Sequence, residues 1–196
     1  MKCAAQHAHF TTTLLFRSHS VTEFIGQTTD FVLGQEFLTW LWHKSETLDN
    51  LFKDAKGREF ALFMEQRIVV QGGEGESLET ATVAGPMSEL REARLGLTTG
   101  KKVTRALVRI ERDADTWQFT LKAEDFSWNS LKTPYQEKPE ADDDPDALLL
   151  EKIFLVESCL ELMDGLYLEF LRLRLDATAW DSETARIRAW MKDRAN

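Results

Sequence analysis

The sequence predicts an α+β domain, in which a mostly antiparallel sheet of about five strands carries helices packed on one face, including one long C-terminal helix. Two observations lead to this prediction. Stretches that alternate apolar and polar residues follow one another through the middle of the chain with short connections, which favours antiparallel pairing. Apolar residues at helical spacing flank this region, at 33–47 and again from Pro145 onward.

Five segments have the composition and the alternation of β-strands. They cover residues 60–64, 68–70, 78–83, 101–112 and 116–122. The last two segments should form a hairpin around the turn Asp113–Ala114–Asp115. Within the final strand we expect the bulky residues Trp117, Phe119 and Leu121 to face the core.

Three shorter helices accompany the sheet. The first covers 33–47, and its apolar residues widen into a face that should be buried on two sides. A second opens at Pro86, a residue tolerated in the first turn, and ends at Gly100. The third runs from about 180 to 192, with Thr178 as its expected N-terminal cap.

The longest predicted helix begins at Pro145, behind an Asp144 cap, and ends near Leu175. Its apolar residues follow an unbroken 4-3 spacing: Leu149, Ile153, Val156, Leu160, Met163, Tyr167 and Phe170. At roughly 45 Å this helix is longer than a small domain needs. Either the whole seam lies in the core, or part of it meets another chain. For the second case we expect a homodimer contact at Met163, Tyr167 and Phe170.

The chain divides into an N-terminal arm, 1–32, without clear periodicity and a single domain, 33–196, that contains an acidic linker at 133–144. With 43% hydrophobic residues, a core can form without disulfides or metals. Cys3 lies far from Cys159, which falls in a helical apolar stripe and is interpreted as a core residue. This cysteine usage suits a reducing, cytoplasmic compartment. No apolar run reaches 18 residues, and the N-terminus lacks the apolar stretch of a signal peptide, so we expect no membrane contact.

The sequence offers little that resembles a catalytic or metal centre. Cys3, His7 and His9 have ligand-like spacing but lack an evident fourth ligand. His43 and Glu46 lie three residues apart on a helix without a second pair elsewhere, so a histidine near the last carbonyls of a helix is the simpler interpretation. No nucleophile motif is present. We therefore expect a non-enzymatic protein without metal or cofactor, although an acid–base pair among its many carboxylates stays open.

Charge is distributed unevenly along the chain. The formal net charge is −9, yet residues 91–112 contain seven Lys or Arg and two Glu, which makes that segment +5 and leaves −14 for the rest. Lys101, Arg105 and Arg109 share one parity on a predicted strand, so alternation would point them to the same face at steps of about 13 Å. Such a stripe can follow the phosphates of a nucleic acid.

Three further cations could extend this stripe: Lys122 on the neighbouring strand, and Arg91 and Arg94 on the preceding helix. The alternative is a solvated sheet face, on which charges are common. The apolar Val103 and Leu107 have the same parity as the stripe and favour that alternative.

Several stretches resemble a known family. They are LGQEFLTWLWHKSE, SELREARLGLTTGKKVTRALVRI, DTWQFTL and the run DDDPDALLLEKIFLVESCLELMDGLYLEFLRLRL. Across 33–194 they are similar to the C-terminal half of recombination-associated proteins of the RdgC type. The resemblance implies association with DNA, because the best-known members are non-enzymatic, ring-shaped dimers that encircle duplex DNA and restrain RecA-type recombinases. Longer relatives carry a further N-terminal region that the first 30 or so residues here do not match, and no DNA-contact residues carry over by motif.

Two functions of different classes follow as hypotheses. The first is a recombination-associated, DNA-binding accessory protein, with duplex DNA, a second copy of the chain and a recombination protein as partners, in the cytoplasm and at the nucleoid. The second is a protein-interaction or assembly module that acts through the long C-terminal helix without binding DNA. An enzyme is the third class.

Overall fold

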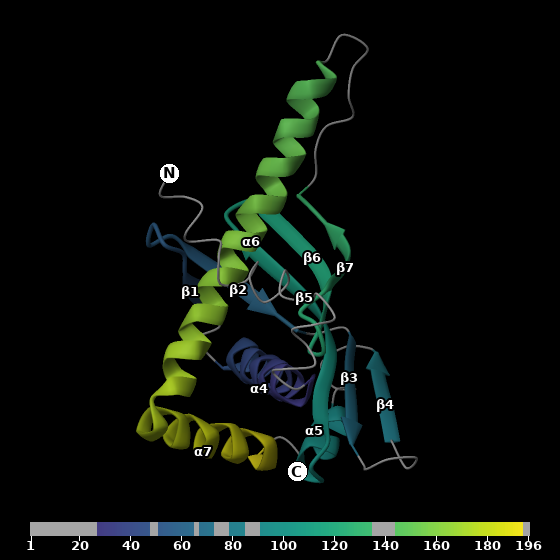
Figure 1. Cartoon of the computed structure of the whole chain (residues 1–196), viewed down its shortest axis with the longest axis vertical. Helices are drawn as coiled ribbons and strands as arrows, with labels where there is room; N and C mark the ends of the chain where they lie inside the picture. Colours follow the sequence, from purple (N-terminus) through teal and green to yellow (C-terminus); the bar gives the residue numbers. More distant parts are fainter. Residues whose placement is uncertain are drawn as a thin grey trace.

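The structure is a computed structural model, and it describes residues 27–47, 51–64, 67–72, 79–84, 91–134 and 144–193. It confirms the α+β class, with a mostly antiparallel sheet and a long C-terminal helix (Figure 1). The helices are α4 (Gln27–Glu46), α5 (Arg91–Thr98), α6 (Pro145–Leu175) and α7 (Ala177–Asp193). The strands are β1 (Leu51–Lys53), β2 (Glu59–Phe63), β3 (Arg67–Gly72), β4 (Glu79–Ala84), β5 (Lys102–Arg112), β6 (Asp115–Lys122) and β7 (Trp128–Lys132).

Strand β5 is the centre of the sheet. Along one edge it pairs with two strands in succession, β2 opposite its C-terminal half and β3 opposite its N-terminal half. Its other edge pairs with β6, and β1, β4 and β7 complete a sheet of seven antiparallel strands. All five expected strands are present. The two additional ones are β1, which has only three residues, and β7, in which Ser130 has a positive φ of 56° that interrupts the alternation.

A β-bulge divides β5 into two parts. Val69 pairs with Arg105, but the next residue, Val70, pairs with Val103, so Thr104 is the extra residue on β5. On the other edge of β5, its carbonyl accepts a hydrogen bond from Ala123 N at 2.9 Å, one residue beyond the last pair of β5 and β6. The inward-facing parity therefore changes at this point.

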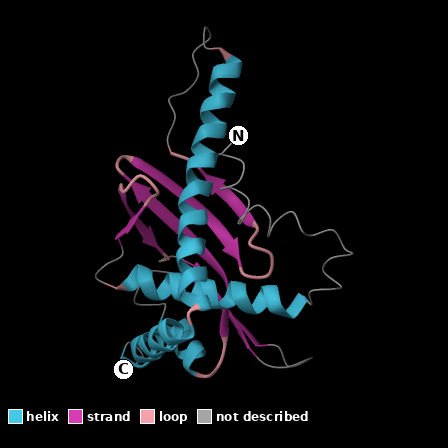
Figure 2. Cartoon of the chain, turned by 60° about the vertical axis from the view of Figure 1, so that its left-hand side comes forward, coloured by secondary structure: helices cyan, strands magenta, loops and turns pink. Residues whose placement is uncertain are grey.

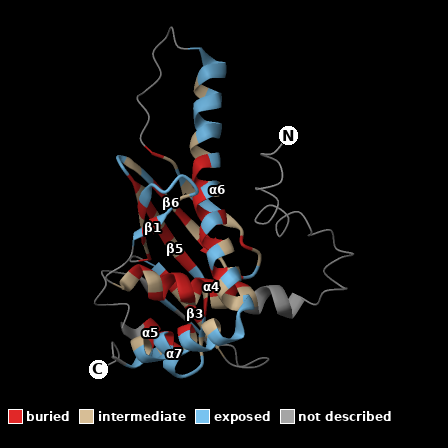
Figure 3. Ribbon diagram, turned by 90° about the vertical axis from the view of Figure 1, so that its left-hand side faces the viewer, coloured by how far each residue is buried: buried red, intermediate tan, exposed pale blue. Residues whose placement is uncertain are grey.

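All four described helices lie on one side of the sheet (Figures 2 and 3). Helix α4 packs on β2 and β5, whereas α5 packs on β3, β4 and β5. Helix α6 is fastened to β6 by Trp117, whose indole Nε1 donates to the carbonyl of Leu155 at 2.9 Å. Helix α7 contacts the other three helices and forms an outer layer.

The buried core lies between the sheet and the first helical layer. Its largest fully buried side chains are Trp40, Trp42, Trp117, Phe37, Phe119 and Phe170. Aromatic side chains of this size remove the most apolar surface from water per residue. The inward alternation predicted for β6 is confirmed, because Trp117, Phe119 and Leu121 are all buried.

Several predicted helix ends are confirmed by their capping geometry. The Asp144 side chain accepts a hydrogen bond from Asp146 N at 3.0 Å at the start of α6, with Pro145 in the first turn. Gly100 ends α5 with a φ of 92°. Two further bonds, from Gly100 N to Leu97 O and from Lys101 N to Gly96 O, complete a Schellman motif there. The predicted start of this helix at Pro86 lies outside the described residues.

Two helix starts were predicted too late in the chain. Helix α4 begins at Gln27, within the segment 1–32 that was predicted to be an N-terminal arm without clear periodicity, and residues 1–26 lie outside the described part. Helix α7 begins at Ala177 rather than near 180. Its cap is Asp176, whose Oδ1 accepts from Ala179 N at 3.0 Å, and Thr178 lies inside the first turn.

Two helical glycines test how closely the layers pack. A Cβ added at Gly34 in α4 would lie 2.0 Å from the carbonyl oxygen of Ala123, whereas one added at Gly165 in α6 would meet nothing within 4 Å. We expect Gly34→Ala to destabilise the fold by about 1–3 kcal/mol, because the helix must move away from the sheet. Gly165→Ala should instead stabilise it by up to about 1 kcal/mol through helix propensity. Urea unfolding of both variants checks this, and equal effects would contradict the close approach.

Candidate nucleic-acid interface

The side of the sheet away from the helices, here called the outer face, carries a group of cations. On β6 it is formed by the residues that alternate with the buried ones, ending in Lys122. Register with the neighbouring strands assigns the rest. The cations on this face include Lys53, Arg67, Arg105, Arg109, Lys122 and Lys132, and the face also carries the carboxylates Glu59 and Glu111. None of the described helices packs against it (Figure 2).

Strand pairing arranges four of these cations in two rows. Arg105 pairs directly with Lys122 across β5 and β6. Four residues further along β5, Arg109 pairs with Gln118, which in turn pairs with Lys132 of β7. The two rows are therefore separated by about 13 Å along the strands. Arg105, Arg109 and Lys122 therefore lie on the same face of the sheet, as the sequence predicted.

Arg109 is more restrained than Arg105. Its guanidinium lies over the ring of Phe63, 4.2 Å from the ring centroid, and forms an ion pair with Glu111. The Arg109 side chain is 29% exposed, and Glu111 neutralises part of its charge. Arg105 is exposed. Arg105 is therefore more accessible than Arg109, and Lys122 is its direct neighbour.

Lys101 does not belong to this face, contrary to the prediction from strict alternation. The bulge at Thr104 reverses the parity, so that Val103 is buried on the helix side together with Ala106. Lys101 shares the parity of Val103. Its side chain runs over Gly72 and Gly96 and lines a pocket between α4 and α7. The bulge thus separates Lys101 from Arg105.

Arg94 is also removed from the predicted stripe, because it is buried. It forms an ion pair with Glu46 of α4, and its guanidinium lies 5.7 Å from the Trp42 ring and 6.0 Å from the Trp190 ring. Glu46 also accepts hydrogen bonds from both indoles, at 2.7 Å from Trp42 and 3.2 Å from Trp190. This cluster joins α4, α5 and α7, so Arg94 has a structural role. Arg91 is the first residue of α5, and its side chain lies outside the described part.

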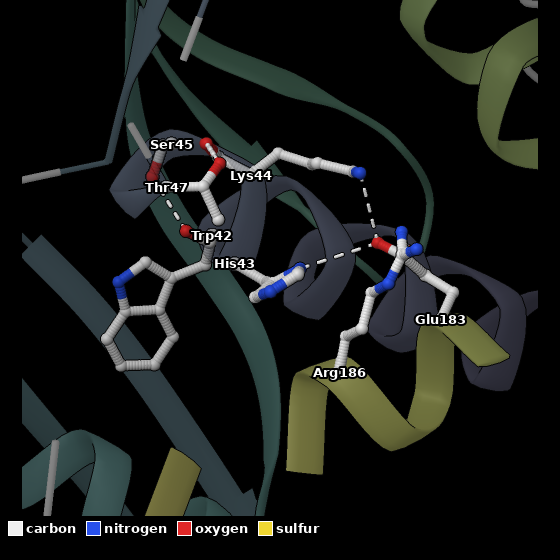
Figure 4. Close-up of polar contacts among 7 residues, drawn as sticks. All are labelled: Trp42, His43, Lys44, Ser45, Thr47, Glu183 and Arg186. Atoms are coloured by element: carbon white, nitrogen blue, oxygen red, sulfur yellow. Dashed lines mark hydrogen bonds and ion pairs between the residues drawn. The ribbon is translucent and has the colours of Figure 1, made fainter. Parts of the chain in front are cut away.

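A second polar cluster joins α4 to α7 (Figure 4). The Glu183 carboxylate, only 3% exposed, lies 3.2 Å from Lys44 Nζ and 3.4 Å from both His43 Nδ1 and Arg186. Burial lowers the pKa of His43, and Lys44 and Arg186 act in the same direction, whereas Glu183 opposes them. Nδ1 has no hydrogen-bond partner with good geometry, so its contact with Glu183 is an electrostatic one. His43 and Glu46 thus contact different partners and do not form a ligand pair.

The residues predicted for self-association are core residues instead. Met163 and Phe170 are 0% exposed and Tyr167 is 3% exposed. Phe37 of α4 packs against the rings of Tyr167 and Phe170, with centroids 5.2 and 5.3 Å away. This half of the α6 seam lies over the sheet and α4, so it cannot contact a second chain. The prediction was wrong about which half of the helix is uncovered.

Cys159 is a core residue, as the sequence predicted. It is fully buried, and the loss of hydration raises the pKa of its thiol to about 12. A thiol in this state is unreactive at neutral pH. Among the residues that the structure describes, no three His, Cys, Asp or Glu side chains gather as metal ligands would. Cys3, His7 and His9 lie outside those residues.

Comparisons with protein-family models, with curated proteins and with solved structures found no match. The resemblance to RdgC-type proteins gains no support from them and stays a prediction from the sequence. Separately, none of the described helices combines the length and the apolar run that crossing a membrane would require.

The Arg94 cluster can be tested by removing its anion. The Glu46 side chain is 2% exposed, so we expect Glu46→Gln to leave a buried guanidinium without its counter-charge and to destabilise the fold by about 3 kcal/mol or more. Glu111→Gln is the matched control, because Glu111 pairs with Arg109 at 39% exposure and such pairs contribute less than about 1 kcal/mol. Chemical denaturation measures the free energy of unfolding of both variants. Similar losses of stability would argue against a structural role of the Arg94 cluster.

Proposed function

We propose that the chain is a non-enzymatic protein that binds DNA through the outer face of its sheet and acts in recombination. One observation supports this binding surface: the two rows of cations lie on a face that none of the described helices covers. The role in recombination rests on the sequence resemblance alone.

The outer face has the chemistry of a phosphate-binding surface. Phosphate oxygens accept hydrogen bonds from Arg and Lys and also from Thr, Gln and Asn side chains. Between its cations the face carries Thr116, Gln118, Thr120 and Asn129, all of which can contribute such contacts. Because these contacts go to the backbone of DNA, we expect binding without sequence preference.

The net charge of −9 opposes this binding and limits its strength. Arg109 is paired with Glu111, so the two rows leave Arg105, Lys122 and Lys132 as the cations that we expect to contact phosphates. Each phosphate neutralised releases condensed counterions, which lowers the logarithm of the affinity by about 0.9 per tenfold rise in salt. Three such contacts predict a total slope of about −2.7 on duplex DNA.

A protein-interaction module is the second candidate. Exposed apolar residues at the start of α6 favour it, and the two functions can coexist because α6 lies on the opposite side of the sheet from the outer face.

Charge reversal at Arg105 tests the DNA surface. We expect Arg105→Glu to weaken binding to any duplex by about tenfold or more and to reduce the salt slope by about 1, because one contact is lost and a repulsion is added. Arg172→Glu on α6 is the control, since it makes the same change of charge at an exposed site away from the sheet. Fluorescence anisotropy at several salt concentrations gives both quantities.

Two results would count against the proposal. One is a wild-type protein that binds no DNA at low salt, which would leave the interaction module as the better function. The other is an equal loss of binding in the Arg105 and Arg172 variants, which would indicate a general charge effect rather than a surface on the sheet.

A further inference from the structure

A cavity of about 360 Å³ lies between α4 and α7, next to the start of β5. Helix α7 contacts both α4 and α5 (Figure 3). The buried clusters around Glu46 and Glu183 join α7 to the last turns of α4. The cavity lies beside an earlier part of α4, which contributes Gln35, Glu36 and Thr39 to its wall. Its volume is within the range of cavities that bind small molecules.

Part of the cavity wall is apolar. Leu97 of α5 and Ile187 of α7 are each 7% exposed. Trp180 and Met191 of α7 are half-buried and also line the cavity. The Trp180 ring is held by the Arg174 guanidinium, which lies 5.1 Å from the ring centroid. A ligand with an apolar body would gain hydrophobic contact with these four lining side chains.

The position of Lys101 at this cavity follows from the backbone around it. Its N–H donates to Gly96 O at 2.9 Å in the Schellman motif that ends α5. Its side chain lies against two glycines, since a Cβ added at Gly72 would be 2.8 Å from Lys101 Cγ and one added at Gly96 would be 3.3 Å from Lys101 Cδ. The bulge at Thr104 that removes Lys101 from the outer face thus brings its side chain to the cavity.

The charges around the cavity have a positive excess. The described residues that line it carry three cations and two carboxylates: Lys101, Lys102, Arg188, Glu36 and Asp181. Glu36 already forms an ion pair with Arg174 at 2.7 Å, and Arg174 is not a lining residue. Three cations therefore remain against one carboxylate, in a protein whose net charge is −9. Concave sites with an excess of positive charge attract anionic ligands.

We propose that this cavity binds a small organic anion, which has an apolar body and a single carboxylate or phosphate group. The apolar body lies against Trp180 and Ile187. The anionic group lies toward Lys102 and Arg188, and the amide of Gln35, a residue that is 9% exposed, can donate a hydrogen bond to it. This binding does not depend on DNA, because the cavity and the outer face lie on opposite sides of the sheet.

NMR titrations at constant ionic strength test the class of ligand, with naphthalene-2-carboxylate, its neutral amide and inorganic phosphate as probes. We expect the carboxylate to shift the methyl signals of Ile187 and Met191 saturably, with a dissociation constant of about 1 mM or below. The amide and phosphate should each bind at least about tenfold more weakly, because each lacks one of the two interactions. No saturable shift with the carboxylate, or an equal affinity for either of the other probes, would overturn the proposal.

Charge reversal tests the position of the anionic group. Lys102→Glu and Arg188→Glu change exposed side chains, so we expect both variants to fold and to bind naphthalene-2-carboxylate about tenfold more weakly. Lys152→Glu is the control, because it makes the same change of charge at an exposed site near the start of α6, and it should leave the affinity unchanged. Unchanged affinity in the first two variants, or equal losses in all three, would refute the site. These titrations contain no DNA, so their outcome is independent of the outer face.

Discussion

Strand β5 has to satisfy hydrogen bonds along both of its edges, while the described helices cover only one of its faces. Its length allows it to pair with β2 and β3 on one side and with β6 on the other, so the remaining strands are positioned relative to it. The bulge at Thr104 allows β3 to pair with the first half of β5 although β2 pairs with the second. The same extra residue decides which cations reach the outer face.

Burial determines which cations of the basic segment 91–112 can contact a ligand. Arg94 is enclosed by α4, α5 and α7, and Arg112 is 7% exposed, stacked over Trp117 at 5.2 Å and close to Asp54. These two arginines hold the layers together and cannot contact a ligand. The positive charge that remains accessible near β5 is smaller than the formal charge of +5 of residues 91–112, but it is concentrated on the outer face.

The sequence predicted regular elements well and departures from regularity poorly. The β6 alternation and the Asp144 cap of α6 are local features, and both are confirmed. The bulge depends on how β3 and β5 pair, so nothing in the residues around Thr104 indicates it. The partnership of Arg94 with Glu46, 48 residues apart in the chain, is equally invisible before the helices pack.

The apolar seam of α6 is another feature whose burial could not be predicted from the local sequence. Its spacing is regular from Leu149 to Phe170, and periodicity alone does not say where the sheet beneath it ends. The sheet and α4 cover Met163 and Phe170, whereas Leu149 and Ile153 extend past them. The cap of α7 was misassigned for a simpler reason: Asp176 and Thr178 are both good capping residues, and only the geometry of the chain after α6 selects Asp176.

The central claim is that the bulge places Lys101 on the helix side of the sheet and leaves Arg105 on the outer face, which we propose binds DNA. Backbone chemical shifts followed during a titration with a short duplex test it residue by residue. We expect the shifts to change at Arg105, Lys122 and Lys132, with Lys101 unaffected although it is only four residues from Arg105. Changes centred on Lys101 and α7, with the outer face silent, would contradict the account.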